Sequence, residues 1–180
     1  MKILKMSLQL VGIMLLVPIV VMATLRFDNR NADGPSIIFP GGELVSGDLH
    51  TGQEPDWTFT NEVQTIELQL EDTLSSSLIW IVENEGRIYV VSKYMSSTLG
   101  RMWKHWAVAA ESGSGLAVIR VGDIRYERKL LRLDGGDIPN GLSAKMTTKY
   151  SRGQAAPETI LADKLAIQTG DTWVFELAAR

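Results

Sequence analysis

The feature that most constrains this chain is an uncharged apolar run near its N-terminus. Residues 6–25 read MSLQLVGIMLLVPIVVMATL. About 20 apolar residues in a helix span the hydrocarbon core of a bilayer, and transmembrane helices tolerate a proline such as Pro18. Residues 1–25 are therefore predicted to form a membrane anchor. A cleaved signal peptide is the alternative, because residues 21–23 place small side chains near a plausible cleavage point.

The charges before this run predict its orientation. Lys2 and Lys5 precede it, and basic residues stay on the cytoplasmic side of a membrane. We therefore expect a single-pass protein of the cell inner membrane with a cytoplasmic N-terminus. Everything after Leu25 is expected to be periplasmic or otherwise extracytoplasmic.

Composition excludes several classes of protein and site. The 180 residues include 18 basic and 21 acidic side chains, for a net charge of -3, and no cysteine. An acidic chain lacks the electrostatic footprint of a nucleic-acid binder. Without cysteine there are no disulfides, thiolate metal sites or lipidated cysteines. The predicted partners are a membrane and a small-molecule ligand, with no nucleic acid.

The rest of the chain is predicted to be one domain, residues 36–180, after a polar linker over residues 26–35. Residues 63–70 alternate as a half-buried strand. Residues 78–82 and 88–91 are apolar on both faces and flank a turn at 84–86, which predicts a hairpin of two central strands. Residues 116–121 and 124–133 predict a second hairpin, and residues 172–177 a last strand with Trp173, Phe175 and Leu177 on one side.

Two short helices are predicted among these strands, over residues 98–111 and 142–150. The first has apolar residues at helical spacing, which predicts one buried stripe, made of Leu99, Met102, Trp103, Trp106 and Ala110. Because hairpins dominate the order of elements, we expect a mainly β (α+β) fold with an antiparallel sheet that closes into a barrel.

The junction from the second hairpin strand to the first helix is the strongest candidate site. The strand ends at Ser92 and Lys93, and the helix carries Arg101 and Lys104. A helix start, an arginine and a lysine together suit a phosphate group. The alternative is that Ser96, Ser97 and Thr98 cap the helix and the basic residues are solvated.

Other polar clusters carry simpler interpretations. His50 lies near Asp48, Glu54 and Asp56, which are potential metal ligands, but the flanking glycines favour an exposed loop. Glu67 and Glu71 share a strand face, and a solvated surface explains them without acid–base chemistry. We therefore predict no metal site and assign no catalytic residue.

Three stretches resemble the pyridoxamine-phosphate-oxidase-like split barrels, especially members that bind a flavin or a deazaflavin. They read GRIYVVS (86–92), WKHWAVAA (103–110) and LAVIRVGDIRYERKLLRL (116–133). The resemblance implies an antiparallel split β-barrel, and that Ser92, Lys93, Arg101 and Lys104 hold the phosphate of FMN or a deazaflavin. Trp103 and His105 would then lie near the ring or the dimer seam. The chain departs from that family at Trp106, where the family has asparagine. It also departs at Gly113 and Ser114, which replace the proline that the family has after this helix.

Two functions follow from the resemblance. The first is a membrane-tethered, exported flavin- or deazaflavin-dependent oxidoreductase. The second is a split barrel without a cofactor that serves as a ligand-binding or assembly module. Deazaflavin and nicotinamide pools are cytoplasmic, so the predicted topology favours the second. In either case the resemblance implies a homodimer.

Overall fold

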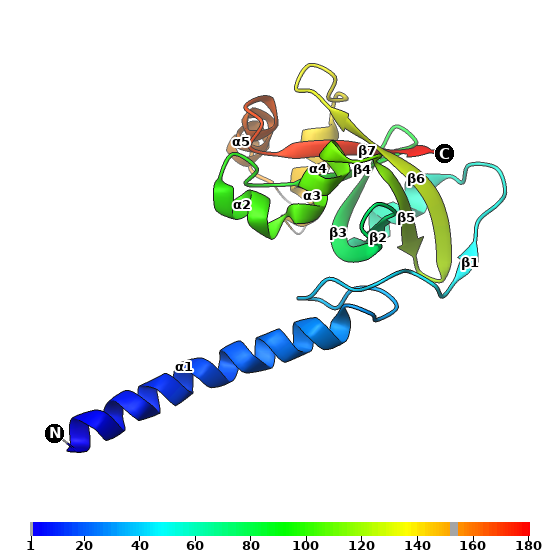
Figure 1. Ribbon diagram of the computed structural model, residues 1–180. Coiled ribbons are helices and arrows are strands. Elements are labelled where there is room, and N and C mark those ends of the chain that lie inside the picture. The colour runs from blue at the N-terminus through cyan, green and yellow to red at the C-terminus, as the bar shows by residue number, and fades with distance from the viewer. Residues whose placement is uncertain (1, 152–154) are drawn as a thin grey trace.

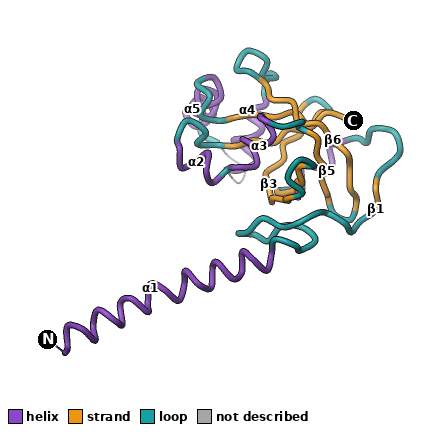
Figure 2. The backbone as a smooth tube through the Cα atoms, in the orientation of Figure 1, coloured by secondary structure: helices purple, strands orange, loops and turns teal. Residues whose placement is uncertain are grey.

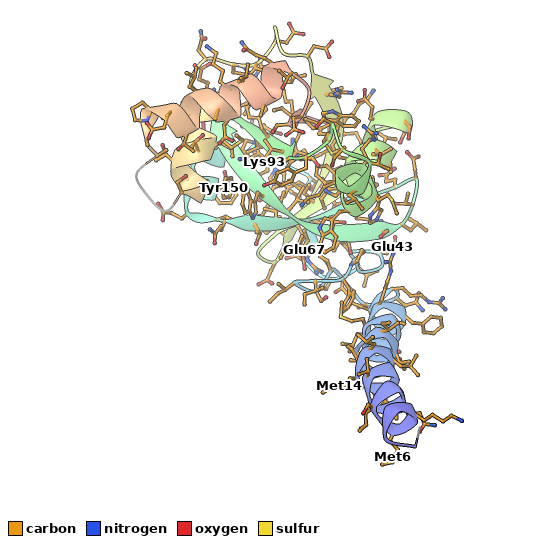
Figure 3. The ribbon with its side chains drawn as sticks, turned by 90° about the vertical axis from the view of Figure 1, so that its left-hand side faces the viewer. Met6, Met14, Glu43, Glu67, Lys93 and Tyr150 are labelled. Atoms are coloured by element: carbon orange, nitrogen blue, oxygen red, sulfur yellow. The ribbon has the colours of Figure 1, made fainter. Side chains whose placement is uncertain are left out.

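The computed structural model describes residues 2–151 and 155–180. It begins with a long helix, α1 (Lys2–Asn29), that projects away from the globular part of the molecule (Figure 1). The barrel leaves this helix uncovered, and large apolar side chains such as Met14 and Leu15 are exposed. Met6 and Met14 mark its course outside the globular part in Figure 3. This one N-terminal helix is long and apolar enough to cross a membrane, as the sequence predicts.

Six antiparallel strands close into a barrel, which confirms the predicted fold class. The order is β6-β5-β2-β3-β4-β7, and β7 pairs back onto β6. A two-residue strand, β1 (Asp48–Leu49), adds to β6 in parallel. The barrel strands are β2 (Thr65–Leu70), β3 (Ser75–Asn84), β4 (Arg87–Ser92), β5 (Leu116–Val121), β6 (Ile124–Leu133) and β7 (Trp173–Ala179).

The turn between β3 and β4 shows why this hairpin can be predicted from sequence. Asn84 pairs with Arg87, so the turn has two residues, Glu85 and Gly86. Their φ angles are 54° and 78°, and two positive φ angles give the turn that matches the twist of paired strands. Glycine at the second position adopts this conformation without steric cost.

Strands β3 and β4 are apolar on both faces because each face packs against something. Inward side chains such as Ile81 and Val90 belong to the barrel core, which also contains Phe175 and Leu177 of β7. Outward side chains such as Val82 form a second cluster under two helices, α4 (Leu142–Tyr150) and α5 (Pro157–Gln168). The helices therefore cover the outer face of this hairpin around Val82, Tyr89 and Val91.

The predicted helix over residues 98–111 is wrong as a single helix. The chain forms α2 (Thr98–Trp103) and α3 (His105–Ser112), with a non-helical Lys104 between them at ψ 42°. This break ends the common stripe. Trp106 and Ala110 are buried at 6% exposure, whereas three predicted stripe residues face outward: Leu99 at 79%, Met102 at 71% and Trp103 at 77%.

The structure also has more than the two short helices predicted. Helix α5 was missed, as was a 3-10 helix, η1 (Trp57–Glu62), before β2. Pro157 at the first position of α5 is a start signal, but Leu161 and Leu165 of that helix are exposed. Its apolar residues therefore do not form one buried face, and the periodicity that identifies a helix is weak.

A loop joins α1 to the barrel (Figure 2). Its conformation is fixed by Arg120 of β5, whose side chain is 10% exposed. Arg120 Nη1 donates to Asp33 at 2.9 Å, and Arg120 Nε donates to Glu67 of β2. Hydrogen bonds from Ser46 and Val45 lower the pKa of Asp33 to about 2. These contacts bind the segment after α1 to the outside of the barrel.

Candidate functional site

The end of β4 places two of the predicted phosphate ligands, Ser92 and Lys93, in internal contacts. Ser92 is fully buried, and its Oγ donates to Met95 Sδ at 3.1 Å. Lys93 Nζ lies 2.7 Å from Asp163 Oδ1 of α5. The other oxygen of Asp163 accepts from Thr147 Oγ1 of α4 at 2.8 Å. The end of β4 is thus linked by polar contacts to α5 and, through Asp163, to α4.

The start of α2 is a capped helix end, as the alternative interpretation expected. Ser97 Oγ accepts from the Gly100 N–H at 2.9 Å, which satisfies one of the free donors of a helix start. Gly100 is required here because a Cβ would lie 1.8 Å from the carbonyl oxygen of Tyr94. Ser96 donates to the Asp171 carboxylate, so a negative group already lies beside this turn.

Arg101, the third predicted ligand, is an exposed residue that also bonds within the chain. Its Nη1 donates to the carbonyl oxygen of Met95 at 2.9 Å. Three of the four predicted phosphate ligands therefore have protein partners, and they do not form a vacant phosphate cradle. The residues at the strand end do not fit the phosphate of a bound flavin in this arrangement. Phosphate binding by Ser92, Lys93 and Arg101 stays a prediction.

The other three predicted site residues, Trp103, Lys104 and His105, line one cavity of about 580 Å³. We call it the junction cavity, because it lies where α1, the following loop and the barrel meet. Helix α1 contributes Met22 and Arg26, residues 36–40 form one wall, β3 contributes Ser77 and Leu78, and residues 102–106 complete the lining.

The wall formed by residues 36–40 is held in place at both ends. Asn29, the last residue of α1, donates its Nδ2 to the carbonyl oxygens of Phe39 and Pro40, at 3.2 and 2.8 Å. Gly41 and Ser76 of β3 exchange two backbone hydrogen bonds at 2.9 and 3.0 Å. The cavity wall is thus bound to the end of α1 on one side and to the barrel on the other.

The lining combines apolar surface with positive charge. Arg26 and Lys104 are its charged members, His105 lies beside Lys104, and no described lining residue is acidic. Within residues 2–151 and 155–180, Lys104 has no ion-pair partner. Burial lowers the pKa of Lys104, because desolvation disfavours the charged form. A negative group in the cavity would compensate this desolvated cation.

The remaining polar clusters are explained by structural contacts. The described residues contain no group of three or more His, Asp or Glu side chains placed to hold a metal. Glu54 bonds to Arg128 and Trp57, and His50 Nε2 lies 2.8 Å from the carbonyl oxygen of Gln53. Glu67 pairs with Arg120, and Glu71 pairs with Arg180.

Sequence reasoning missed the parts of the junction cavity that lie far apart in the chain. Met22 and Arg26 were assigned to the anchor and the linker, and Ile38 and Leu78 were not considered as site residues. Arg26 offered one signal, because it is the first charged residue after the apolar run. Helices that end at a membrane surface place such residues beside the lipid head groups.

The fold and this cavity define a small antiparallel β-barrel with an apolar N-terminal helix and an open site at their junction. Among solved structures, the conserved hypothetical protein Rv2991 from Mycobacterium tuberculosis is similar, with a TM-score of 0.50. The match covers 74% of this chain and 83% of that chain at 14% sequence identity, and it shows the fold alone. No protein-family model and no curated protein matches the chain.

Proposed function

We propose that this protein is a membrane-tethered split barrel that binds a small molecule in the junction cavity. The observation that carries the proposal is the cavity itself, because three predicted site residues converge there with the end of α1. Ligand sites are concave, mostly apolar and furnished with a few polar groups. The junction cavity has this character, while the strand end has its polar groups already paired.

The test is to ask what remains bound to the full-length protein. Native mass spectrometry of the chain released from a neutral detergent should show a bound molecule. Leu78→Trp places an indole in the cavity and should abolish that adduct without loss of fold. Leu161→Trp, a matched change at an exposed leucine of α5, should keep it. Wild-type protein that carries no adduct, or an adduct that survives in Leu78→Trp, would contradict the proposal.

Flavin- or deazaflavin-dependent oxidoreduction is the second candidate function. It is supported by Trp103 and His105, two flat rings that line the cavity beside Lys104, since aromatic side chains stack on flat ring systems. The partners of Ser92, Lys93 and Arg101 argue against it. A visible spectrum of the purified protein and a titration with FMN distinguish the two candidates, because the binding module has no flavin absorbance.

We also propose that the barrel lies on the exported side of the cell inner membrane. The support is the pair Lys2 and Lys5 before the apolar run, together with the positive-inside bias. A reporter that is active only in the periplasm, fused after Arg180, should be active, and a cytoplasmic reporter at the same position should be silent. The reverse pattern would contradict the proposed topology.

A homodimer is proposed from the resemblance to split barrels, in which two chains share a groove. Most soluble oligomers are closed and symmetric, and two-fold dimers are the commonest. Light scattering of the full chain in neutral detergent, corrected for the micelle, should report twice the mass of one chain. A monomer at micromolar concentration would overturn this expectation.

A further inference from the structure

The junction cavity spans the level at which α1 changes from apolar to charged. Met22 lies inside the apolar run, and Arg26 is the first charged residue after it. The two residues are four apart, so they lie on one face of the helix, and about 6 Å separates them along its axis. If α1 crosses a bilayer, this stretch lies where hydrocarbon meets head groups. The inference below therefore rests on the proposed tether.

The part of the cavity rim contributed by α2 is suited to contact with lipid. Met102 and Trp103 both line the cavity and are 71% and 77% exposed, and Leu99 beside them is 79% exposed. Helix α2 lies at the left of the barrel in Figure 1, on the same side as the one to which α1 projects. Tryptophan is enriched at membrane–water interfaces, because its ring is apolar and its N–H is polar. Contiguous exposed apolar surface of this kind marks an interaction site.

The cavity wall formed by residues 36–40 also carries exposed apolar side chains. Ile37 and Ile38 line the cavity with 90% and 65% of their surface exposed. Asn29 fixes this wall next to the end of α1. Apolar side chains from α1, the loop and α2 thus line the same cavity. Exposure of these apolar side chains to water is unfavourable, whereas an acyl chain beside α1 would cover them.

The charges of the cavity specify the polar end of its ligand. Arg26 and Lys104 come from different elements and line the same space, with no acidic residue in the described lining. Arginine binds phosphate through paired donors, and lysine acts as a mobile point charge. Basic side chains next to a membrane-spanning helix bind anionic lipid head groups in the same way.

We infer that the junction cavity binds one anionic phospholipid of the bilayer, with its phosphate at Arg26 and Lys104 and an acyl chain against Met22, Met102 and Trp103. The combination of a basic pair with an apolar wall at the end of α1 distinguishes this ligand from a free anion, which would leave the apolar wall uncovered. It also distinguishes it from a neutral lipid, which would leave Lys104 without a counter-charge.

The experiment uses the full chain in phosphatidylcholine nanodiscs that contain a small share of brominated lipid. Bromine on an acyl chain quenches a nearby indole, and the difference between wild type and Trp103→Phe isolates the signal of Trp103. Brominated phosphatidylglycerol should quench Trp103 more strongly than brominated phosphatidylcholine at the same share. Lys104→Gln should reduce this preference about fivefold, the effect expected of one lysine beside an anionic head group.

Three controls separate the inference from its alternatives. Lys104→Arg should keep the preference, and so should Lys129→Gln, which removes an exposed lysine of β6 outside the cavity lining. Equal quenching by both lipids in wild type would overturn the inference, as would loss of quenching on addition of inorganic phosphate alone. Absence of quenching by either lipid would also overturn it.

The same measurements distinguish this inference from the proposed function. An adduct without an acyl chain that Leu78→Trp removes would leave the ligand-binding function standing and overturn the lipid assignment. A cavity with no adduct of any kind would overturn both.

Discussion

Trp106→Ala should destabilise the barrel by about 3–5 kcal/mol, the usual effect of truncating a buried large aromatic side chain. Trp106 is 6% exposed and belongs to the barrel core. Its ring centroid lies 5.8 Å from that of Phe175 of β7. Removal of the indole leaves a cavity at the point where α3 packs onto the barrel. Chemical denaturation of the full chain in neutral detergent, followed by near-ultraviolet circular dichroism, measures the loss.

Trp103→Ala is the matched control, three residues earlier in the sequence. Its side chain is 77% exposed, and substitutions at such positions change stability by no more than about 0.5 kcal/mol. The two tryptophans should therefore differ sharply in their effect on stability. Equal losses for both variants would contradict the break at Lys104 and restore the single buried stripe that the sequence predicts.

The barrel could be predicted because its strands are defined by local patterns. The strand at 63–70 alternates along its length, and the hairpins turn at Glu85-Gly86 and Gly122-Asp123, where glycine tolerates a positive φ angle. Closure of the barrel follows from the predominance of hairpins. These features need no knowledge of distant contacts, and the predicted bounds of β5 and β6 agree with the structure.

The break between α2 and α3 could not be predicted in this way. It accompanies the close approach of Gly100 to the Tyr94 carbonyl and the cap made by Ser97. Periodicity alone places Leu99 and Met102 on the same stripe as Trp106, because an unbroken helix repeats every 3.6 residues. The bend at Lys104 turns Leu99, Met102 and Trp103 outward, and Met102 and Trp103 then line the junction cavity.

The sequence identifies only the part of the candidate site whose residues are adjacent in the chain. Trp103, Lys104 and His105 are adjacent in sequence, so one motif identifies all three. The sequence predicts Lys93 as a phosphate ligand, whereas in the structure Lys93 pairs with Asp163. This partner could not be foreseen, because it lies on α5, a helix with a weak sequence signal. The other cavity walls come from α1, residues 36–40 and β3, and only tertiary structure brings these segments together.

Glu54→Ala should destabilise the protein by about 3 kcal/mol, because it leaves a buried positive charge without its partner. The side chain of Arg128 is 3% exposed, and its Nη1 donates to both carboxylate oxygens of Glu54, at 2.8 and 2.9 Å. The guanidinium also lies 4.7 Å from the ring centroid of Trp57. Glu54 accepts a third hydrogen bond from Trp57 Nε1 at 2.6 Å. Denaturation under the same conditions as for Trp106→Ala measures the effect.

Two further variants separate the buried charge from the loop that carries Glu54. Asp56→Ala removes a cap, the hydrogen bond from the Thr58 N–H at 3.0 Å, and should cost much less stability than Glu54→Ala, because Asp56 is exposed. Glu54→Ala combined with Arg128→Met should be more stable than Glu54→Ala alone, because an apolar side chain needs no counter-charge in the core. Recovery would be partial, since Trp57 Nε1 still lacks its acceptor and an unsatisfied buried donor costs about 1–3 kcal/mol. A double variant no more stable than Glu54→Ala would assign the loss to Trp57 and contradict the role of Glu54 as the counter-charge of Arg128.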